Sequence, residues 1–296
     1  MVDLHIHTTY SDGKQTVAEV LEKAEAQGLE WISITDHQSV GAYKELKNPE
    51  VRKLFGGKIV AGVELLFEHD GIINEVLGYG IDPEKMAKAN FLQEDEIQRR
   101  EIVYLRNLHS RLLELGFRLK DLKELEVELV ATKKIARQVI FKDIWLDGNK
   151  AIAESLGFFD KESFNKFFWN NIESPKGKNY AYQQIESLET NSKAIRDAGG
   201  KVFMAHLFRA NREDRESDKL ESEVLAVLGY AVKNKLIDGI EVGYSQKYFN
   251  HKQTAFLKKF CREHNLLMSG GSDNHRPESK LAELDAEPWM NLTKRL

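Results

Sequence analysis

Cysteine is almost missing from this chain, and its scarcity limits the chemistry that the protein can carry. Cys261 is the one cysteine among 296 residues, so neither an intramolecular disulfide nor a zinc cluster held by several thiolates can form. Any metal ion would therefore have to be held by nitrogen and oxygen ligands.

Long apolar runs are also missing. No stretch approaches the roughly 18 apolar residues that a membrane-spanning helix requires, and Asp3 and two histidines stand where the apolar part of a signal peptide would begin. We therefore expect a cytoplasmic protein with no membrane partner. The net charge of −4, from 43 basic and 47 acidic residues, argues against a nucleic-acid coat protein, although a local basic patch inside a cleft stays open.

The first third of the chain alternates between strand and helix patterns. VDLHIH alternates apolar and polar residues as a strand does, and TVAEVLEKAEAQGL then shows an apolar stripe at helical spacing, which Thr16 can cap and Gly28 can end. WISITDH is a second short strand, and two further strand patterns flank the turn signal Asp70-Gly71. This alternation predicts a parallel sheet with function at the C-terminal ends of its strands.

A different pattern fills the middle of the chain. Residues 91–116 are typical of one long helix that ends at Gly116, and further helical segments follow to about residue 170. The alternation of strands and helices resumes from about residue 180 and continues to LLMSGGSDNH. We therefore predict an α/β barrel domain made of residues 1–83 and 180–296, interrupted by a helical insertion at residues 84–179.

Side chains of the types that bind metals gather where the predicted strands end. The residues concerned are His5, His7, Asp36, His37, Glu64, Glu75, His206, Glu241, Asp273 and His275. Residues i and i+2 of a strand point to the same face, so His5 with His7, and Asp273 with His275, can each hold one ion. A lone His-x-His is more often a surface pair. It is the series at successive strand ends, which meet at one rim of a barrel, that predicts a metal centre suited to hydrolysis at phosphorus.

The motifs DLHIHTTYSDG, SITDH, AGVE, AH and GGSDNH, in this order and spacing, resemble those of the PHP (polymerase and histidinol phosphatase) family. The resemblance covers residues 1–82 and about 180–276. It implies a distorted (β/α)7 barrel, similar to a TIM barrel, with two or three divalent metal ions (Zn, Mn or Fe) at the strand ends. It also implies a hydrolase that acts on phosphoric esters.

The resemblance implies a distribution of the ligands as well. One ion would be held by His5, His7, Glu64 and Asp273; a second would share Glu64 and add Glu75 and His206; a third would be held by Asp12, His37 and His275. Many family members have a histidine where this chain has Glu75, and an oxygen ligand there would favour harder ions such as Mn or Fe. His69 is the alternative to Glu75 for this position.

Several further residues have both a functional and an ordinary interpretation. Asp36 either orients a ligand or caps a helix, and Glu241 either touches the metal centre or is a structural carboxylate. Arg209 either grips a phosphate with its guanidinium group or is a solvated loop residue. Lys176 and Lys178, in the loop that leaves the insertion, stand where related enzymes present residues that contact the substrate.

The function that we predict is metal-dependent hydrolysis of phosphate esters, with a metal-bridging hydroxide as the nucleophile. Glu64 would bridge two ions, and Asp273 would be both a ligand and the proton acceptor for the nucleophilic water. We expect the substrate to be a nucleotide or a short oligonucleotide, selected by the helical insertion acting as a cap over the rim. No obligate protein partner is evident.

Three alternatives stay open at this point. A small-molecule phosphatase of the histidinol-phosphate type would use the same metals. A non-catalytic, metal-stabilised module would have eroded motifs, whereas this chain keeps its candidate ligands. A hydrolase of C–N bonds, as in the barrel amidohydrolases, generally employs a lysine carbamate bridge, and this chain has a glutamate in the bridging place.

Overall fold

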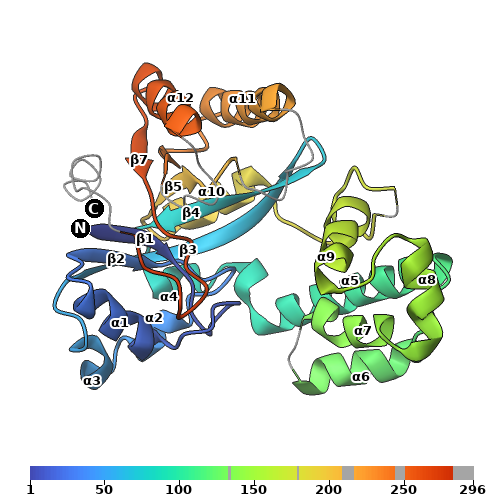
Figure 1. The fold of residues 1–296 in the computed structure, drawn as a ribbon. Coiled ribbons are helices and arrows are strands. Elements are labelled where there is room, and N and C mark those ends of the chain that lie inside the picture. Colours follow the sequence, from blue (N-terminus) through green and yellow to red (C-terminus); the bar gives the residue numbers. More distant parts are fainter. Residues whose placement is uncertain (133–134, 179, 209–216, 244–250, 283–296) are drawn as a thin grey trace. The chain divides into compact units, whose positions relative to one another are not determined.

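The computed structural model describes residues 1–132, 135–178, 180–208, 217–243 and 251–282 (Figure 1). The chain packs as two compact units. One, the sheet unit, comprises Met1–His69, Asn74–Ala89 and Glu186–Leu296; the other, the helical unit, comprises Asp70–Ile73 and Asn90–Ile185. The role of the helical insertion as a cap over the metal centre stays a prediction.

Seven strands form one sheet in the described residues, and their order in space is their order in the sequence. They are β1 (Val2–Ile6), β2 (Trp31–Ile34), β3 (Lys58–His69), β4 (Ile72–Tyr79), β5 (Lys201–Met204), β6 (Gly239–Glu241) and β7 (Leu267–Ser269). β1, β2 and β3 are parallel, as are β5, β6 and β7, whereas β4 runs antiparallel to β5. The sheet is curled rather than flat (Figure 1).

β4 runs against its neighbours because the chain turns back at Asp70 and Gly71, which have φ values of 50° and 73°. Glycine adopts such angles without a steric penalty, and aspartate tolerates them. The predicted α/β fold is therefore present as a curled sheet with helices, but its strands do not all run in one direction. Closure into a complete (β/α)7 barrel stays a proposal.

The first strand also pairs with the chain that follows β7. The Leu4 N–H donates to the Gly270 carbonyl at 3.1 Å, and the His7 N–H donates to the Asn274 carbonyl at 2.9 Å. Ile6 and Asn274 form a parallel bridge. Two segments from opposite ends of the sequence therefore lie side by side, and the polar residues that follow β1 and β7 become neighbours.

The helices of the sheet unit connect and follow its strands. They are α1 (Val17–Ala26), α2 (Ala42–Glu45), α3 (Pro49–Arg52), α4 (Pro83–Met86), α10 (Leu188–Asp197), α11 (Ser217–Lys233) and α12 (His251–Glu263). α1 begins where predicted because Thr16 and Glu19 form a capping box, in which each side chain accepts the other's backbone N–H. Val17, Val20 and Leu21 of its apolar stripe are buried, and this burial is the main source of its stability.

The helical unit is built around α5. Its elements are η1 (Asn90–Leu92), α5 (Glu94–Glu114), α6 (Leu122–Thr132), α7 (Ala136–Ile144), η2 (Asp147–Asn149), α8 (Lys150–Ser155), α9 (Lys161–Phe168) and the π-helix η3 (Trp169–Glu173). The long helix predicted over residues 91–116 is α5, and Gly116 follows it with a φ of 93°. Leu105, Leu108 and Leu112 of α5 are buried with Phe164 of α9 in a core within this unit. None of the described helices, α5 included, is long and apolar enough to cross a membrane.

Replacement of Leu105 by alanine tests this core. The side chain is fully buried, and Leu→Ala at such a position lowers the free energy of unfolding by about 2–5 kcal/mol. Urea unfolding of the whole chain, followed by circular dichroism, measures the loss. Val127→Ala on α6 is the control, because the Val127 side chain is 68% exposed and its truncation changes stability by less than about 0.5 kcal/mol. Equal unfolding curves for the two variants would contradict the packing described.

Candidate metal centre

Nine imidazole and carboxylate side chains come together in the sheet unit, and all nine are candidates from the sequence. They stand on β1, β3 and β4 and on the segments that follow β1, β2, β5 and β7. Their nitrogen and oxygen atoms form three overlapping groups, and within each group these atoms lie within 4.8 Å of one another. Ligand atoms at such separations can share one cation.

The inner group consists of His5, Glu64, His206 and Asp273, all of which are buried. His5 Nε2 lies 3.1 Å from Glu64 Oε2 and 3.4 Å from Asp273 Oδ1. His206 Nε2 lies 2.9 Å from the other carboxylate oxygen of Glu64. Two imidazoles and two carboxylates therefore face one another away from bulk solvent.

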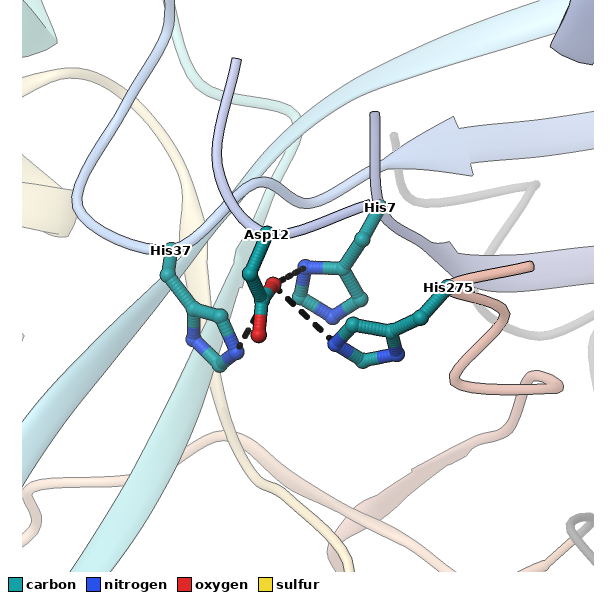
Figure 2. Close-up of side chains that lie close together, drawn as sticks. All are labelled: His7, Asp12, His37 and His275. Carbon is teal, nitrogen blue, oxygen red and sulfur yellow. Dashed lines mark ion pairs between the residues drawn. The ribbon is translucent and has the colours of Figure 1, made fainter. Parts of the chain in front are cut away.

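The outer group consists of His7, Asp12, His37 and His275, whose side chains point toward one another in Figure 2. Asp12 Oδ1 lies 3.1 Å from His275 Nε2, 3.8 Å from His37 Nε2 and 4.0 Å from His7 Nδ1. The side chain of Asp12 is 62% exposed, and those of His37 and His275 are 22% and 23% exposed. The outer group is therefore the solvent-facing side of the cluster.

Glu64 connects the inner and outer groups. Its Oε2 lies 3.1 Å from His7 Nε2 and 3.2 Å from His37 Nδ1, in addition to its contacts with the inner histidines. The side chain is completely buried. A carboxylate that reaches four imidazoles at once fits the bridging role predicted for it.

The groups in the structure differ from the ligand sets that the family resemblance implies. The resemblance gives His7 to the same ion as His5, whereas the structure groups it with the outer residues. Its ring lies between the two groups, because Nδ1 faces Asp12 and Nε2 is 3.1 Å from Asp273 Oδ1. His206 belongs to the inner group rather than to a separate one. The distribution of ligands over individual ions stays a prediction.

Of the two candidates for the hairpin position, Glu75 lies in the cluster. Glu75 Oε2 is 3.4 Å from His206 Nε2, and its Oε1 is 3.7 Å from His37 Nδ1. The His69 ring packs against Tyr230 of α11 instead, with 4.6 Å between the ring centroids. A carboxylate at this position favours the harder ions of the predicted set, Mn and Fe.

The charges of the cluster shift the pKa values of its members. Burial opposes the charged form of His7, but close contacts with Asp273 and Glu64 outweigh burial and raise its pKa to about 9. Burial also opposes the ionised form of Glu64, yet His5 and His37 hold the pKa of this carboxyl well below its usual range. Burial prevails at His37, whose pKa is lowered. Protonated imidazoles therefore neutralise the negative charge of the carboxylates, and bound cations can do the same.

The donor set fits divalent cations. Within the part of the chain that the structure describes, no hydrogen bond of ordinary geometry reaches either buried carboxylate oxygen of Asp273. Ring nitrogens of His5, His7 and His275 lie 3.1–3.5 Å from its Oδ1. His5 Nε2 and His7 Nε2 face each other at 3.1 Å, so at least one of them has to hold a proton or an ion there. Imidazole nitrogens and carboxylate oxygens are the ligands that Zn, Mn and Fe accept.

Glu241 of β6 supports the inner histidines. Its Oε1 lies 3.0 Å from His5 Nδ1, and its Oε2 accepts a hydrogen bond from the His206 backbone N–H at 2.8 Å. A carboxylate on one ring nitrogen directs the opposite nitrogen toward a metal and raises its basicity. Of the two interpretations of Glu241, these contacts favour the supporting carboxylate.

Asp36 holds the turn between His7 and Asp12. It accepts hydrogen bonds from the Thr8 N–H and from the Thr8 and Ser11 hydroxyl groups, each at 2.7 Å. It caps none of the described helices, since α2, which follows it, has no side-chain cap. Asp36 therefore orients the turn that carries a candidate ligand. The sequence analysis did not single out Thr8 and Ser11. Their position between the candidate ligands His7 and Asp12 is the sequence feature that could have indicated a supporting role.

Two motif glycines allow other segments to approach β1 closely. A Cβ at Gly13 would lie 2.5 Å from the His7 carbonyl, and a Cβ at Gly271 would lie 2.3 Å from the His5 backbone nitrogen. Both distances are far below van der Waals contact with backbone atoms that cannot move aside. Glycine is therefore required in both SDG and GGSDNH so that the ligand-bearing segments can pack against the first strand.

The residues predicted to contact the substrate are Arg209, Lys176 and Lys178. Arg209 is outside the described residues, and its role stays a prediction. Lys176 and Lys178 are exposed in the turn after η3 of the helical unit. Lys176 packs over the turn between β3 and β4, where a Cβ at Gly71 would lie 2.9 Å from Lys176 Cγ. Contact of either lysine with the substrate also stays a prediction.

Comparison with known proteins gives a consistent assignment. The model of the PHP domain matches residues 3–238. The chain is 25% identical over 303 residues to a 5′-3′ exoribonuclease of Haemophilus influenzae, covering 99% of this chain and 93% of that protein. It is 25% identical over 284 residues to a 3′,5′-nucleoside bisphosphate phosphatase of Chromobacterium violaceum, covering 93% of this chain and 87% of that protein. A crystal structure from Bifidobacterium adolescentis, assigned as a metal-dependent phosphoesterase, has a TM-score of 0.63 and 22% identity, covers 99% of this chain and 96% of that chain, and supports the fold.

Binding of Mn²⁺ at a pH of about 7.5 should release protons. The His7 ring, whose pKa is about 9, is charged in the metal-free protein at that pH and must lose a proton before its nitrogen can coordinate an ion. As the pH rises through about 9 the His7 ring becomes neutral, so its contribution to the proton release falls. Titration calorimetry in HEPES and in Tris, which differ in ionisation enthalpy, measures the number of protons.

Two variants separate this effect from general titration of histidines. His7→Asn lacks the ionising ring, so we expect fewer released protons. His251→Gln is the control, since His251 is exposed at the first residue of α12, and it should match the unaltered chain. Equal heats in the two buffers would contradict the charge balance described for the cluster.

Proposed function

Because the chain belongs to the PHP domain family, we propose that it is a metal-dependent phosphoesterase, a hydrolase that cleaves phosphate esters of nucleotides or short oligonucleotides. The observation that carries the proposal is the cluster joined by Glu64, a buried carboxylate of the inner group that also lies 3.1 Å from His7 Nε2 and 3.2 Å from His37 Nδ1 of the outer group. Shared ligands of this kind hold cations close enough together to act on one phosphate group.

The nine clustered side chains would hold two or three divalent ions, with Glu64 as the bridge. Such ions, when bound, acidify a water molecule and offset the negative charge that builds on the phosphoryl group. The carboxylate at Glu75 favours Mn or Fe over Zn in this proposal. Glu241 keeps the inner histidines oriented, so that their free nitrogens meet the ions.

The unequal exposure of the two groups indicates the side from which the substrate would approach. The inner group is closed to solvent, whereas Asp12 and the edges of His37 and His275 are exposed. The phosphate of the substrate would therefore approach on the outer side. Asp273, which lies between the groups, would accept the proton from the attacking water at a carboxylate oxygen. Arg209 would bind a phosphate oxygen, and Lys176 and Lys178 would contact the rest of the substrate.

The substrate class rests on the names of two relatives that align over nearly the whole chain. One is an exoribonuclease and the other a nucleoside bisphosphate phosphatase. These reactions share the cleavage of a phosphate ester at a nucleotide. We therefore favour nucleotides and short oligonucleotides over histidinol phosphate, and we keep the latter as a competing substrate in the test.

Assays with added Mn²⁺ test the proposal directly. The substrates are adenosine 3′,5′-bisphosphate, a short 5′-phosphorylated RNA, histidinol phosphate and a simple amide. We expect release of phosphate or of mononucleotides from the first two. Turnover of histidinol phosphate alone would favour the small-molecule alternative, turnover of the amide alone would favour C–N hydrolysis, and a chain that binds Mn²⁺ without turnover would be a non-catalytic module.

Substitutions in the cluster should remove the activity. Glu64→Gln takes the bridging charge from the centre, so we expect kcat/KM to fall by about 100-fold or more. Glu68→Gln is the matched control, because Glu68 lies on the same strand with an exposed side chain, and its kcat/KM should stay close to that of the unaltered chain. Equal losses in both variants would mean that the cluster does not carry the reaction.

A further inference from the structure

The segment after β7 carries two of the proposed ligands but has little regular structure to hold it. Residues 270–282 contain one isolated bridge and a turn, and no helix or strand. We propose that Asp3 and Lys23 act as a clamp that fixes this segment and thereby positions Asp273 and His275. The inference rests on the proposed function, since it concerns how ligands of that same centre are held in place.

Asp3 binds both ends of the segment with one carboxylate. It accepts hydrogen bonds from the Ser272 N–H at 2.9 Å, from the Ser272 hydroxyl at 2.6 Å and from the Ala282 N–H at 2.7 Å. It also accepts the N–H of His5 at 3.2 Å. Asp3 is completely buried. Its carboxylate would be costly to bury without these donors, and the buried donors would lose their acceptor if it were removed.

Lys23 of α1 holds the middle of the segment. Its ammonium group lies 3.3 Å from the Arg276 carbonyl oxygen and 3.0 Å from that of Pro277, and it also contacts the Ser279 carbonyl oxygen. The ammonium group also donates to Gln15 Oε1 at 3.1 Å. The ammonium group therefore has three protons for four oxygen partners, and its charge holds three backbone carbonyl groups of the segment together.

Backbone strain at Asp273 shows why a clamp is needed. Its φ is 52°, in the left-handed region, which aspartate tolerates better than most residues but adopts less readily than glycine. Such a conformation persists only where the surroundings enforce it. Asp3 holds Ser272, directly before Asp273, while Lys23 holds Arg276, directly after His275. The segment would relax if these two anchors were lost.

The two anchors act on different groups of the metal centre. Asp3 binds Ser272, the residue before Asp273 of the inner group, whereas Lys23 binds the carbonyl oxygen of Arg276, the residue after His275 of the outer group. Loss of Lys23 should therefore weaken the ion held by the outer group and spare the inner one. Loss of the Asp3 charge should weaken the ion held by the inner group.

Lys23→Met in the full chain tests the clamp, with Mn²⁺ titration calorimetry as the measurement. We expect one class of Mn²⁺ site to weaken by roughly ten-fold or more, as for other residues that orient metal ligands, while the tightest class keeps its affinity. Lys23→Arg keeps the charge and several donors and should recover most of the affinity. Lys44→Met is the control, because Lys44 is an exposed lysine on α2 of the same unit.

Hydrogen exchange supplies a readout that needs no metal. In the metal-free protein the Ser272 and Ala282 amides should exchange slowly, because Asp3 accepts both. Asp3→Asn should accelerate their exchange and leave the amides of α1 unchanged. If this buried variant fails to fold, the same measurement on Lys23→Met, at residues 276–280, serves instead.

The outcomes separate the clamp from the proposed function. Unaltered Mn²⁺ affinity in Lys23→Met overturns the clamp, and so does a variant that melts earlier but binds Mn²⁺ as tightly as before, which would mark Lys23 as merely structural. An unaltered chain that binds none of Mn²⁺, Fe²⁺ and Zn²⁺ overturns the proposed function, whereas the exchange of the Ser272 and Ala282 amides still tests whether Asp3 holds the segment. Metal binding by the unaltered chain can be measured before any variant is made.

Discussion

Glu64 carries the charge around which the sheet unit is organised. Its carboxylate is completely buried and lies 2.9–3.2 Å from nitrogen atoms of His5, His7, His37 and His206. An ionised carboxylate without positive partners is very costly in such surroundings. The strands therefore have to place groups here that neutralise this charge. A histidine can do so when its ring is protonated, and a neutral histidine can instead bind a cation that does so.

Three carboxylates outside the cluster hold its parts in place. Glu241 orients the inner histidines, Asp36 fixes the turn after β1, and Asp3 joins the two ends of the segment after β7. The candidate ligands mostly follow strands rather than lie within them, so ladder hydrogen bonds do not position them. Hydrogen bonds from side chains to backbone amides take over that task, and they do so with buried partners that leave little freedom of movement.

Local sequence patterns predicted what depends on neighbouring residues. The cap at Thr16, the end of α5 at Gly116 and the turn at Asp70 and Gly71 were all visible, because caps and turns are decided within a few residues. The nine clustered side chains were also named in advance, eight of them because their types recur at strand ends and Asp12 through the family resemblance. The sequence did not predict which ligands lie together in one group. The spacing of His5 and His7 indicates a common face, but it does not say which partner each ring meets across the sheet.

The sequence by itself determined the chemistry available to this protein. Its single cysteine leaves nitrogen and oxygen as ligands, and the order of His, Asp and Glu motifs along the chain identifies the family. Only the tertiary structure decided that Glu75 enters the cluster while His69 packs against Tyr230. It also decided that Asp3 meets Ser272 and Ala282, which are 269 and 279 residues away along the chain. Such contacts arise when the sheet curls and its distant segments pack together, and no local pattern records them.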